Sequence, residues 1–142
     1  MCIRDSVNTL DKKTSQIAGE YNLTFSQFMV LEALYSKGDM SVGEVRERIL
    51  SSVGTISLII NNLVKMNYVE RLADEKDKRV SILHLTKEGR DVISKVAPKN
   101  EMMIEESMKV LDSEEKEKLL YLLKKMGGKL DGKKSENENK RF

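Results

Sequence analysis

The chain has 142 residues, of which 34% are charged and 5% aromatic, with one proline, one cysteine and a formal net charge of only +2. This length fits one domain, or one small domain with additional helices, and the composition favours helices over a β-sandwich, whose turns need more glycine and proline. The lone Cys2 excludes an intrachain disulfide and a cysteine-rich zinc site. No apolar run is long enough to span a bilayer and no signal peptide is visible, so we expect a cytoplasmic protein without a membrane partner.

The N-terminal half begins with MCIRDS, residues 1–6, which show no helical periodicity. We expect them to be foreign to the gene, translated from sequencing-adapter sequence joined to a truncated reading frame. Apolar residues at helical spacing then predict a helix over residues 7–21. Two capping boxes, Thr24 with Gln27 and Ser41 with Glu44, each precede an apolar stripe and predict the starts of two further helices.

The segment SSVGTISLIINNLVKMN, residues 51–67, predicts a helix with two different faces. Its apolar face is formed by Val53, Ile56, Ile60 and Leu63. The opposite face carries small polar side chains, one leucine and one lysine: Ser51, Ser52, Thr55, Leu58, Asn62 and Lys65. YVERL and VSILHL then predict two strands that enclose a charged tip, so residues 40–86 read as a helix-turn-helix followed by a β-hairpin.

The C-terminal part is predicted to be helical. Thr86 starts a helix that extends to about residue 110, and Pro98 is expected to kink or break it. A capping box from Asp112 to Glu115 starts a last helix, whose apolar residues lie on more than one side and therefore need a partner surface. Dimerisation is the simplest explanation of that need. Residues 129–142 have almost no apolar content and are expected to be disordered.

A helix that presents hydroxyls and amides outward suits a duplex groove, because these groups donate to and accept from base edges. The hairpin then becomes a wing, whose Lys76, Lys78 and Arg79 reach the minor groove or the backbone while Asp77 pairs with Arg79. A plain solvated surface explains the same residues, since residues 65–79 hold five bases and four acids. A protein-interaction module therefore stays open, whereas no phosphate loop, metal-ligand cluster or activated nucleophile indicates an enzyme.

From Leu23 to about Gly128 the chain resembles the MarR family of transcriptional regulators, through LTFSQFMVLEAL, SVGEV, GTISLIINNLVKMNYVERLADEKDKRV and LTKEG. Through VLEALYSKG, ILSS and DKRV it is most similar to the branch that controls resistance to hydroquinones and catechols. The resemblance implies a mainly α fold with a small β-hairpin wing. It assigns a first dimerisation helix to residues 1–22, a winged helix-turn-helix DNA-binding domain to 23–86 and C-terminal dimerisation helices to 87–128.

The resemblance also implies a homodimeric repressor that reads pseudo-palindromic double-stranded DNA. The residues predicted to contact DNA are Ser51, Ser52, Thr55, Ser57, Leu58, Asn62, Lys65, Lys76, Asp77, Lys78 and Arg79. Leu58 stands where many relatives carry a polar side chain. Since an exposed leucine can contact a thymine methyl group, this departure bears on the operator sequence rather than on DNA binding itself.

Members of the family commonly bind a small phenolic or other aromatic effector between the dimerisation helices and the winged domain. Candidate lining residues here are Tyr21, Phe25, Phe28, Met29 and Tyr35, although ordinary core packing is the commoner role for any one of them. Some relatives sense peroxides through a cysteine near the first helix, but Arg4 and Asp5 give Cys2 no apolar setting. His84 has no nearby metal-ligand partners in the sequence, so we expect a structural histidine, no metal and no cofactor.

Overall fold

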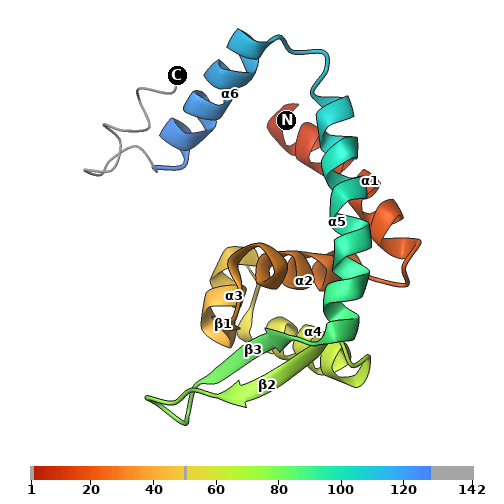
Figure 1. Cartoon of the computed structure of the whole chain (residues 1–142). Coiled ribbons are helices and arrows are strands. Elements are labelled where there is room, and N and C mark those ends of the chain that lie inside the picture. Colours follow the sequence, from red (N-terminus) through yellow and green to blue (C-terminus); the bar gives the residue numbers. More distant parts are fainter. Residues whose placement is uncertain (1, 50, 129–142) are drawn as a thin grey trace. The chain divides into compact units, whose positions relative to one another are not determined.

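Figure 1 shows the computed structural model of the chain, which describes residues 2–49 and 51–128 and leaves the side chain of residue 53 undescribed. In chain order the elements are α1 (Cys2–Gly19), α2 (Phe25–Lys37), β1 (Met40–Ser41), α3 (Val42–Ile49), α4 (Val53–Lys65), β2 (Val69–Ala73), β3 (Ser81–Leu85), α5 (Lys87–Ser107) and α6 (Ser113–Met126). The described residues form two compact units, one up to Met103 and one from Ile104 onward. The predicted fold class is confirmed: a mainly helical chain with a small β wing.

The wing contains one strand more than the predicted hairpin. β2 and β3 pair in antiparallel fashion from Val69↔Leu85 to Ala73↔Ser81, and β1 joins the other edge of β3, which gives the strand order β1-β3-β2. Directly opposite residues share a face of the sheet. Leu83 and Leu85 are buried, so the face that carries them is turned to the helices.

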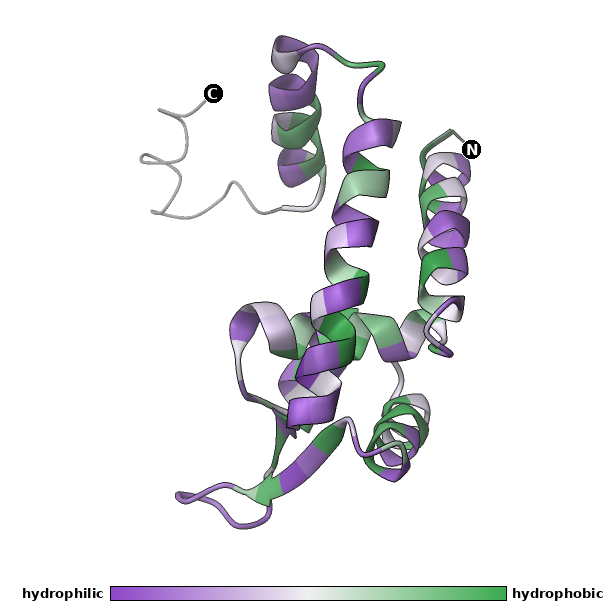
Figure 2. Cartoon of the chain, turned by 45° about the vertical axis from the view of Figure 1, so that its right-hand side comes forward, coloured by the Kyte–Doolittle hydropathy of each residue, from purple (hydrophilic) through white to green (hydrophobic). Residues whose placement is uncertain are grey.

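The core of the first unit is one apolar cluster, built from the predicted stripes. Phe28, Leu31 and Leu34 on α2 meet Ile56, Ile60 and Leu63 on α4, and Leu83, Ile93 and Val96 join from β3 and α5. The hydrophobic colour gathers on these inner surfaces in Figure 2, whereas the wing tip is hydrophilic. This packing leaves the other side of α4 at the surface.

The predicted helix starts are confirmed by their hydrogen bonds. The Thr24 hydroxyl accepts from the Gln27 backbone N–H at 3.2 Å, and the Gln27 side chain accepts from the Thr24 N–H at 3.0 Å. Ser41 with Glu44 and Asp112 with Glu115 form the same reciprocal pairs, which satisfy backbone donors that a helix start leaves without a partner. Gly38 ends α2 with a φ of 84°, a conformation that favours glycine.

The LTKEG motif fastens the start of α5 to the turn after α4. The Thr86 N–H donates to the Tyr68 carbonyl at 3.1 Å, and its hydroxyl donates to the Asn67 carbonyl at 2.6 Å. Gly89 is required because a Cβ atom there would lie 2.0 Å from the Tyr68 carbonyl oxygen. The two helices are therefore coupled through backbone contacts that only glycine permits at this position.

Two predictions about helix bounds are corrected, and two predictions about the ends of the chain are not tested. α1 begins at Cys2 rather than at residue 7, because a helix anchored by the buried Thr14 and Ala18 extends outward at little cost even without an apolar stripe. The break predicted at Pro98 is absent: α5 continues through this exposed proline because Ile93, Val96 and Ala97 are buried around it. The foreign origin of residues 1–6 stays a prediction, and the tail 129–142 lies outside the described residues.

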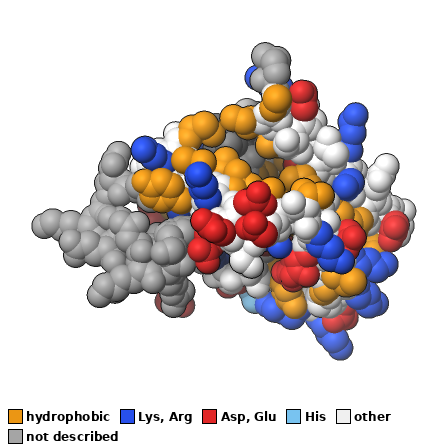
Figure 3. All heavy atoms as spheres, turned by 90° about the horizontal axis from the view of Figure 1, so that it is seen from above, with side chains coloured by type: hydrophobic (Ala, Val, Ile, Leu, Met, Phe, Trp, Pro, Cys, Tyr) orange, Lys and Arg blue, Asp and Glu red, His pale blue; other side chains and the backbone are white. Residues whose placement is uncertain are grey.

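α6, in the second unit, has no buried residue over its whole described length. Its large apolar side chains are instead at the surface, namely Leu120, Leu122, Leu123 and Met126. Figure 3 likewise shows apolar side chains at the surface between charged ones. Among the described residues, no helix combines the length and the hydropathy that crossing a bilayer requires.

Candidate nucleic-acid interface

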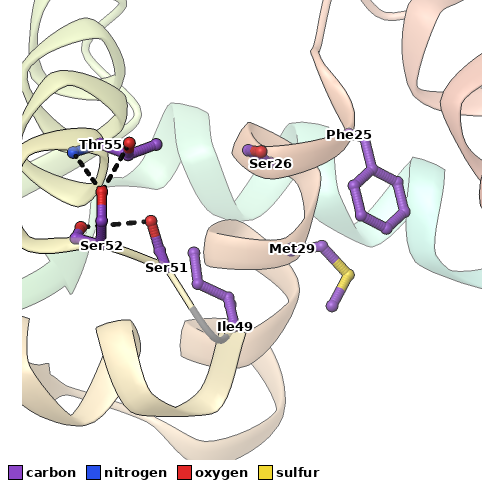
Figure 4. A pocket seen from close by; sticks show the side chains of 7 residues that line it. All are labelled: Phe25, Ser26, Met29, Ile49, Ser51, Ser52 and Thr55. Atoms are coloured by element: carbon purple, nitrogen blue, oxygen red, sulfur yellow. Dashed lines mark hydrogen bonds between the residues drawn. The ribbon is translucent and has the colours of Figure 1, made fainter.

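The N-terminus of α4 is organised by serine and threonine hydroxyls. Ser52 caps the helix, because its hydroxyl oxygen accepts from the Thr55 backbone N–H at 3.2 Å. The same hydroxyl donates to the Thr55 side-chain oxygen at 2.8 Å, and the Ser51 hydroxyl donates to the Ser52 carbonyl at 3.4 Å (Figure 4). A capped helix start with hydroxyls beside it presents backbone N–H groups and the positive end of the helix dipole toward an anion.

The outer face of α4 lies where the sequence predicts it. Ser52, Thr55, Ser57 and Lys65 are exposed, and Leu58 is 62% exposed. Ser51 and Asn62 are half-buried at the margins of this face. The predicted inner face is confirmed by Ile56, Ile60 and Leu63, and Ile59, which the pattern did not single out, is buried with them. The face is thus a narrow polar strip around one apolar side chain.

The wing tip is held in shape by Asp74 and Asp77. Asp74 accepts the Asp77 backbone N–H at 3.2 Å, and Asp77 accepts the Arg79 backbone N–H at 3.0 Å. The predicted pair is present: Arg79 Nε donates to Asp77 Oδ1 at 3.1 Å and its Nη2 to Oδ2 at 3.2 Å. These hydrogen bonds from Arg79 hold the pKa of the Asp77 carboxyl below its ordinary value. Arg79 stays 91% exposed, so its remaining donors face solvent.

One further contact joins the wing to α4 and was not predicted. Arg71 on β2 donates from Nη2 to the Asn61 side-chain oxygen on α4 at 2.5 Å. Both residues are exposed. Sequence reasoning counted Arg71 among the local bases but left Asn61 out, because it lies beside the predicted face rather than on it.

A hollow of about 320 Å³ opens where α2, the end of α3 and the start of α4 meet. Its wall is formed by Phe25, Ser26, Met29, Ile49, Ser51, Ser52 and Thr55 (Figure 4). Phe25 and Met29 are two of the predicted effector-binding residues. Ser51, Ser52 and Thr55 were predicted for DNA alone, so the hollow combines two of the predicted effector residues with three of the predicted DNA-binding residues.

The other predicted effector residues lie away from this hollow. Phe28 is buried in the core of the first unit. Tyr21 faces Lys99, whose Nζ lies 5.0 Å from the ring centroid, and Tyr35 is half-exposed beneath Arg90 at 5.9 Å. The Tyr21 contact and Glu20 raise the pKa of Lys99. Ser26 and Ile49 line the hollow without having been predicted, since nothing in their sequence spacing marks a cavity.

Neither Cys2 nor His84 lines the hollow or belongs to the outer face of α4 or the wing tip. Cys2 is exposed on α1. His84 Nδ1 lies 2.7 Å from Asp39 Oδ1 and so ties β3 to the turn after α2, which agrees with a structural role. Within the described residues, no three His, Cys, Asp or Glu side chains gather to form a metal site.

The sequence of the chain matches one known family of regulators and an individual regulator. The SarA/Rot family of transcriptional regulators matches residues 12–96. The transcriptional regulator MhqR of Bacillus subtilis is 31% identical over 108 residues, which cover 76% of this chain and 74% of MhqR.

Two solved structures show the same fold. A mutant of MarR from Escherichia coli superposes with a TM-score of 0.73 at 25% identity, over 88% of this chain and 93% of that one. BpsR of Bordetella bronchiseptica, whose DNA binding is regulated by 6-hydroxynicotinic acid, superposes with a TM-score of 0.78 at 25% identity, over 89% of this chain and 90% of BpsR.

Proposed function

Because the chain belongs to the MarR family of DNA-binding transcriptional regulators, in its MhqR-like branch, we propose that it is a dimeric repressor of a pseudo-palindromic operator, released by a small phenolic or other aromatic ligand. The observation that carries this proposal is the pairing of two exposed features. α4 presents Thr55, Leu58 and Lys65 outward. The wing carries Arg79, whose guanidinium is oriented by its hydrogen bonds to Asp77.

α4 enters the major groove in this proposal. Its Thr55 hydroxyl and Asn62 amide offer hydrogen bonds to base edges, and Leu58 offers an apolar contact to a thymine methyl group. The free N–H groups at the helix start, beside Ser52, bind a phosphate and set the register of the helix on the duplex.

The wing reaches the adjacent minor groove. Asp77 binds two nitrogens of Arg79 and holds the guanidinium in one direction, which lowers the conformational entropy lost on binding. Lys76 precedes the pair and Lys78 lies between its two residues; both are exposed, so they add phosphate contacts.

A second copy of the chain supplies the other half of the site. The exposed apolar residues of α6 need a partner surface, and so do Ile3 and Val7 on α1. A symmetric dimer buries the same surfaces on both subunits. In such a dimer two α4 helices lie about one turn of DNA apart, and the two-fold symmetry of the dimer requires a pseudo-palindromic operator.

The hollow beside α4 is the proposed effector site. Its volume of about 320 Å³ suits a single aromatic ring. Phe25, Met29 and Ile49 provide apolar contacts, and the hydroxyls of Ser51 and Thr55 provide partners for a phenolic oxygen. Because these hydroxyls also belong to the proposed DNA interface, ligand and operator compete for them, which explains release.

Fluorescence anisotropy of a labelled duplex tests the proposal. The operator candidate is a pseudo-palindrome sought in the DNA upstream of the gene, and its base-shuffled version is the control. We expect at least 10³-fold tighter binding to the palindrome, and a loss of about 1–3 kcal/mol on Arg79→Ala. Lys95→Ala, an exposed cation on α5, is the matched control and should bind as wild type.

The nearly balanced charge of the wing favours one other candidate, a winged module that binds protein without reading DNA. Residues 65–79 carry five bases against four acids. Equal and weak binding to both duplexes at physiological salt would support this second function and contradict the first.

A further inference from the structure

Arg71 occupies the junction between the two parts of the interface. Its register partner across the sheet is Leu83, which is fully buried, so Arg71 leaves β2 on the face turned to the helices. Its guanidinium nevertheless reaches solvent, because it extends beyond the core and binds Asn61 on α4. The cation therefore bridges the recognition helix and the wing at their exposed edge.

Asn61 shares a surface with the proposed reading residues. It follows Leu58 by three positions and precedes Lys65 by four, and residues at these spacings are neighbours on a helix. The Arg71 guanidinium is thus held beside the strip that faces the major groove.

The charge of Arg71 is left uncompensated by this contact. Asn61 is neutral, so it fixes the direction of the guanidinium without cancelling its charge. In residues 2–49 and 51–128, no carboxylate forms an ion pair with Arg71, whereas Arg79 is paired with Asp77. A guanidinium has five donors, and one hydrogen bond to an amide leaves the others available.

A duplex that holds α4 in its major groove and the wing in the adjacent minor groove has one phosphodiester strand between them. This strand passes the junction of α4 and β2, where Arg71 lies. We propose that Arg71, positioned by Asn61, binds a phosphate of the strand that separates the two grooves. This inference rests on the proposed DNA-binding function and adds a contact that neither the reading face nor the wing tip supplies.

The test is the salt dependence of duplex binding, measured by anisotropy over a series of KCl concentrations with the full-length protein. Each lost phosphate contact makes the negative slope of log K against log salt shallower by about 0.9, so Arg71→Ala makes it shallower by about 1.8 for a dimer. Binding to the operator and to its shuffled version weakens by the same factor, since a phosphate carries no base identity. Lys95→Ala keeps the wild-type slope.

Asn61→Asp separates a phosphate contact from a purely structural bridge. The new carboxylate strengthens the link between α4 and β2 but cancels the charge of Arg71. A phosphate contact predicts weaker binding and a smaller slope, whereas a structural bridge predicts unchanged or tighter binding. Arg71→Lys retains the charge and should keep most of the slope, which guards against a misfolded alanine variant.

Wild-type slopes for both Arg71→Ala and Asn61→Asp would overturn the inference and leave the proposed function standing. A wild-type protein that binds no duplex in a salt-dependent way would overturn both.

Discussion

Replacing Gly89 by alanine tests the coupling between α4 and α5. The added Cβ would lie 2.0 Å from the carbonyl oxygen of Tyr68, 2.8 Å from its carbonyl carbon and 3.0 Å from its Cα. These are backbone atoms, so no side-chain rotation relieves the clash and α5 must move away from the turn after α4. That movement stretches the hydrogen bonds that Thr86 makes to Tyr68 and Asn67.

The expected cost combines three effects. Overpacking costs roughly 1–3 kcal/mol, and a weakened hydrogen bond costs roughly 0.5–1.5 kcal/mol. The higher helix propensity of alanine offsets about 1 kcal/mol of this destabilisation. The net result is a destabilisation of about 2 kcal/mol, which lowers the Tm by roughly 4–8 °C in a chain of this size.

Gly54→Ala is the matched control, measured with Gly89→Ala by thermal unfolding followed by circular dichroism. Gly54 also lies in the first turn of a helix, but its Cβ would meet nothing within 4 Å. This control should leave the Tm unchanged or raise it. A Gly89→Ala protein as stable as wild type, or an equal loss in both variants, would refute the steric reasoning.

Three further predictions concern the wing, the last helix and the hollow. The Arg79 hydrogen bonds lower the pKa of Asp77, so the stability that the pair contributes is fully present above the unfolded-state pKa and is lost as the pH falls through the lower folded value. Carboxyl NMR titration should place the midpoint below 3.8 and move it upward in Arg79→Ala. Asp112→Ala removes the N-cap of α6 and should lower its stability by about 1 kcal/mol, seen as faster amide exchange in the first turn of α6 and unchanged exchange in α2. Phe25→Ala should raise the concentration of a catechol or hydroquinone needed to release the operator, whereas Tyr35→Ala, outside the hollow, should not; equal effects of both would reject the hollow as the effector site.

Local signals made the helix starts and the wing predictable. Thr24 with Gln27, and Asp112 with Glu115, form their hydrogen bonds over three residues, so the sequence contains both partners within one turn. Asp77 and Arg79 are also close in sequence, and their pairing follows from the turn that joins them.

What could not be predicted depends on residues that meet only in the folded chain. β1 is only two residues long and pairs with β3 across about 40 residues. Because Ser41 also caps the next helix, the sequence predicted a helix start there and no strand. The Arg71–Asn61 bridge joins two elements whose relative position the sequence does not state. The hollow likewise combines Ser26 on α2 with Ile49 on α3, and neither residue has a distinctive spacing.

Continuity of helices was also underestimated. The sequence of residues 2–6 lacks an apolar stripe, yet α1 includes them because a helix anchored further along extends readily. Pro98 removes one hydrogen bond, but the burial of its neighbours Val96 and Ala97 outweighs that loss. Cooperative extension decided the first case and tertiary packing the second, and local propensity decided neither.

Hydroxyl-radical footprinting of the DNA upstream of the gene tests the central claim most directly, namely that α4 and the wing of two subunits read one duplex. The account predicts two protected segments on one face of the DNA, with centres about 10 base pairs apart, and a loss of the flanking minor-groove protection in Arg79→Ala. Uniform cleavage at protein concentrations that shift the whole duplex, or protection that ignores the palindrome, would contradict it.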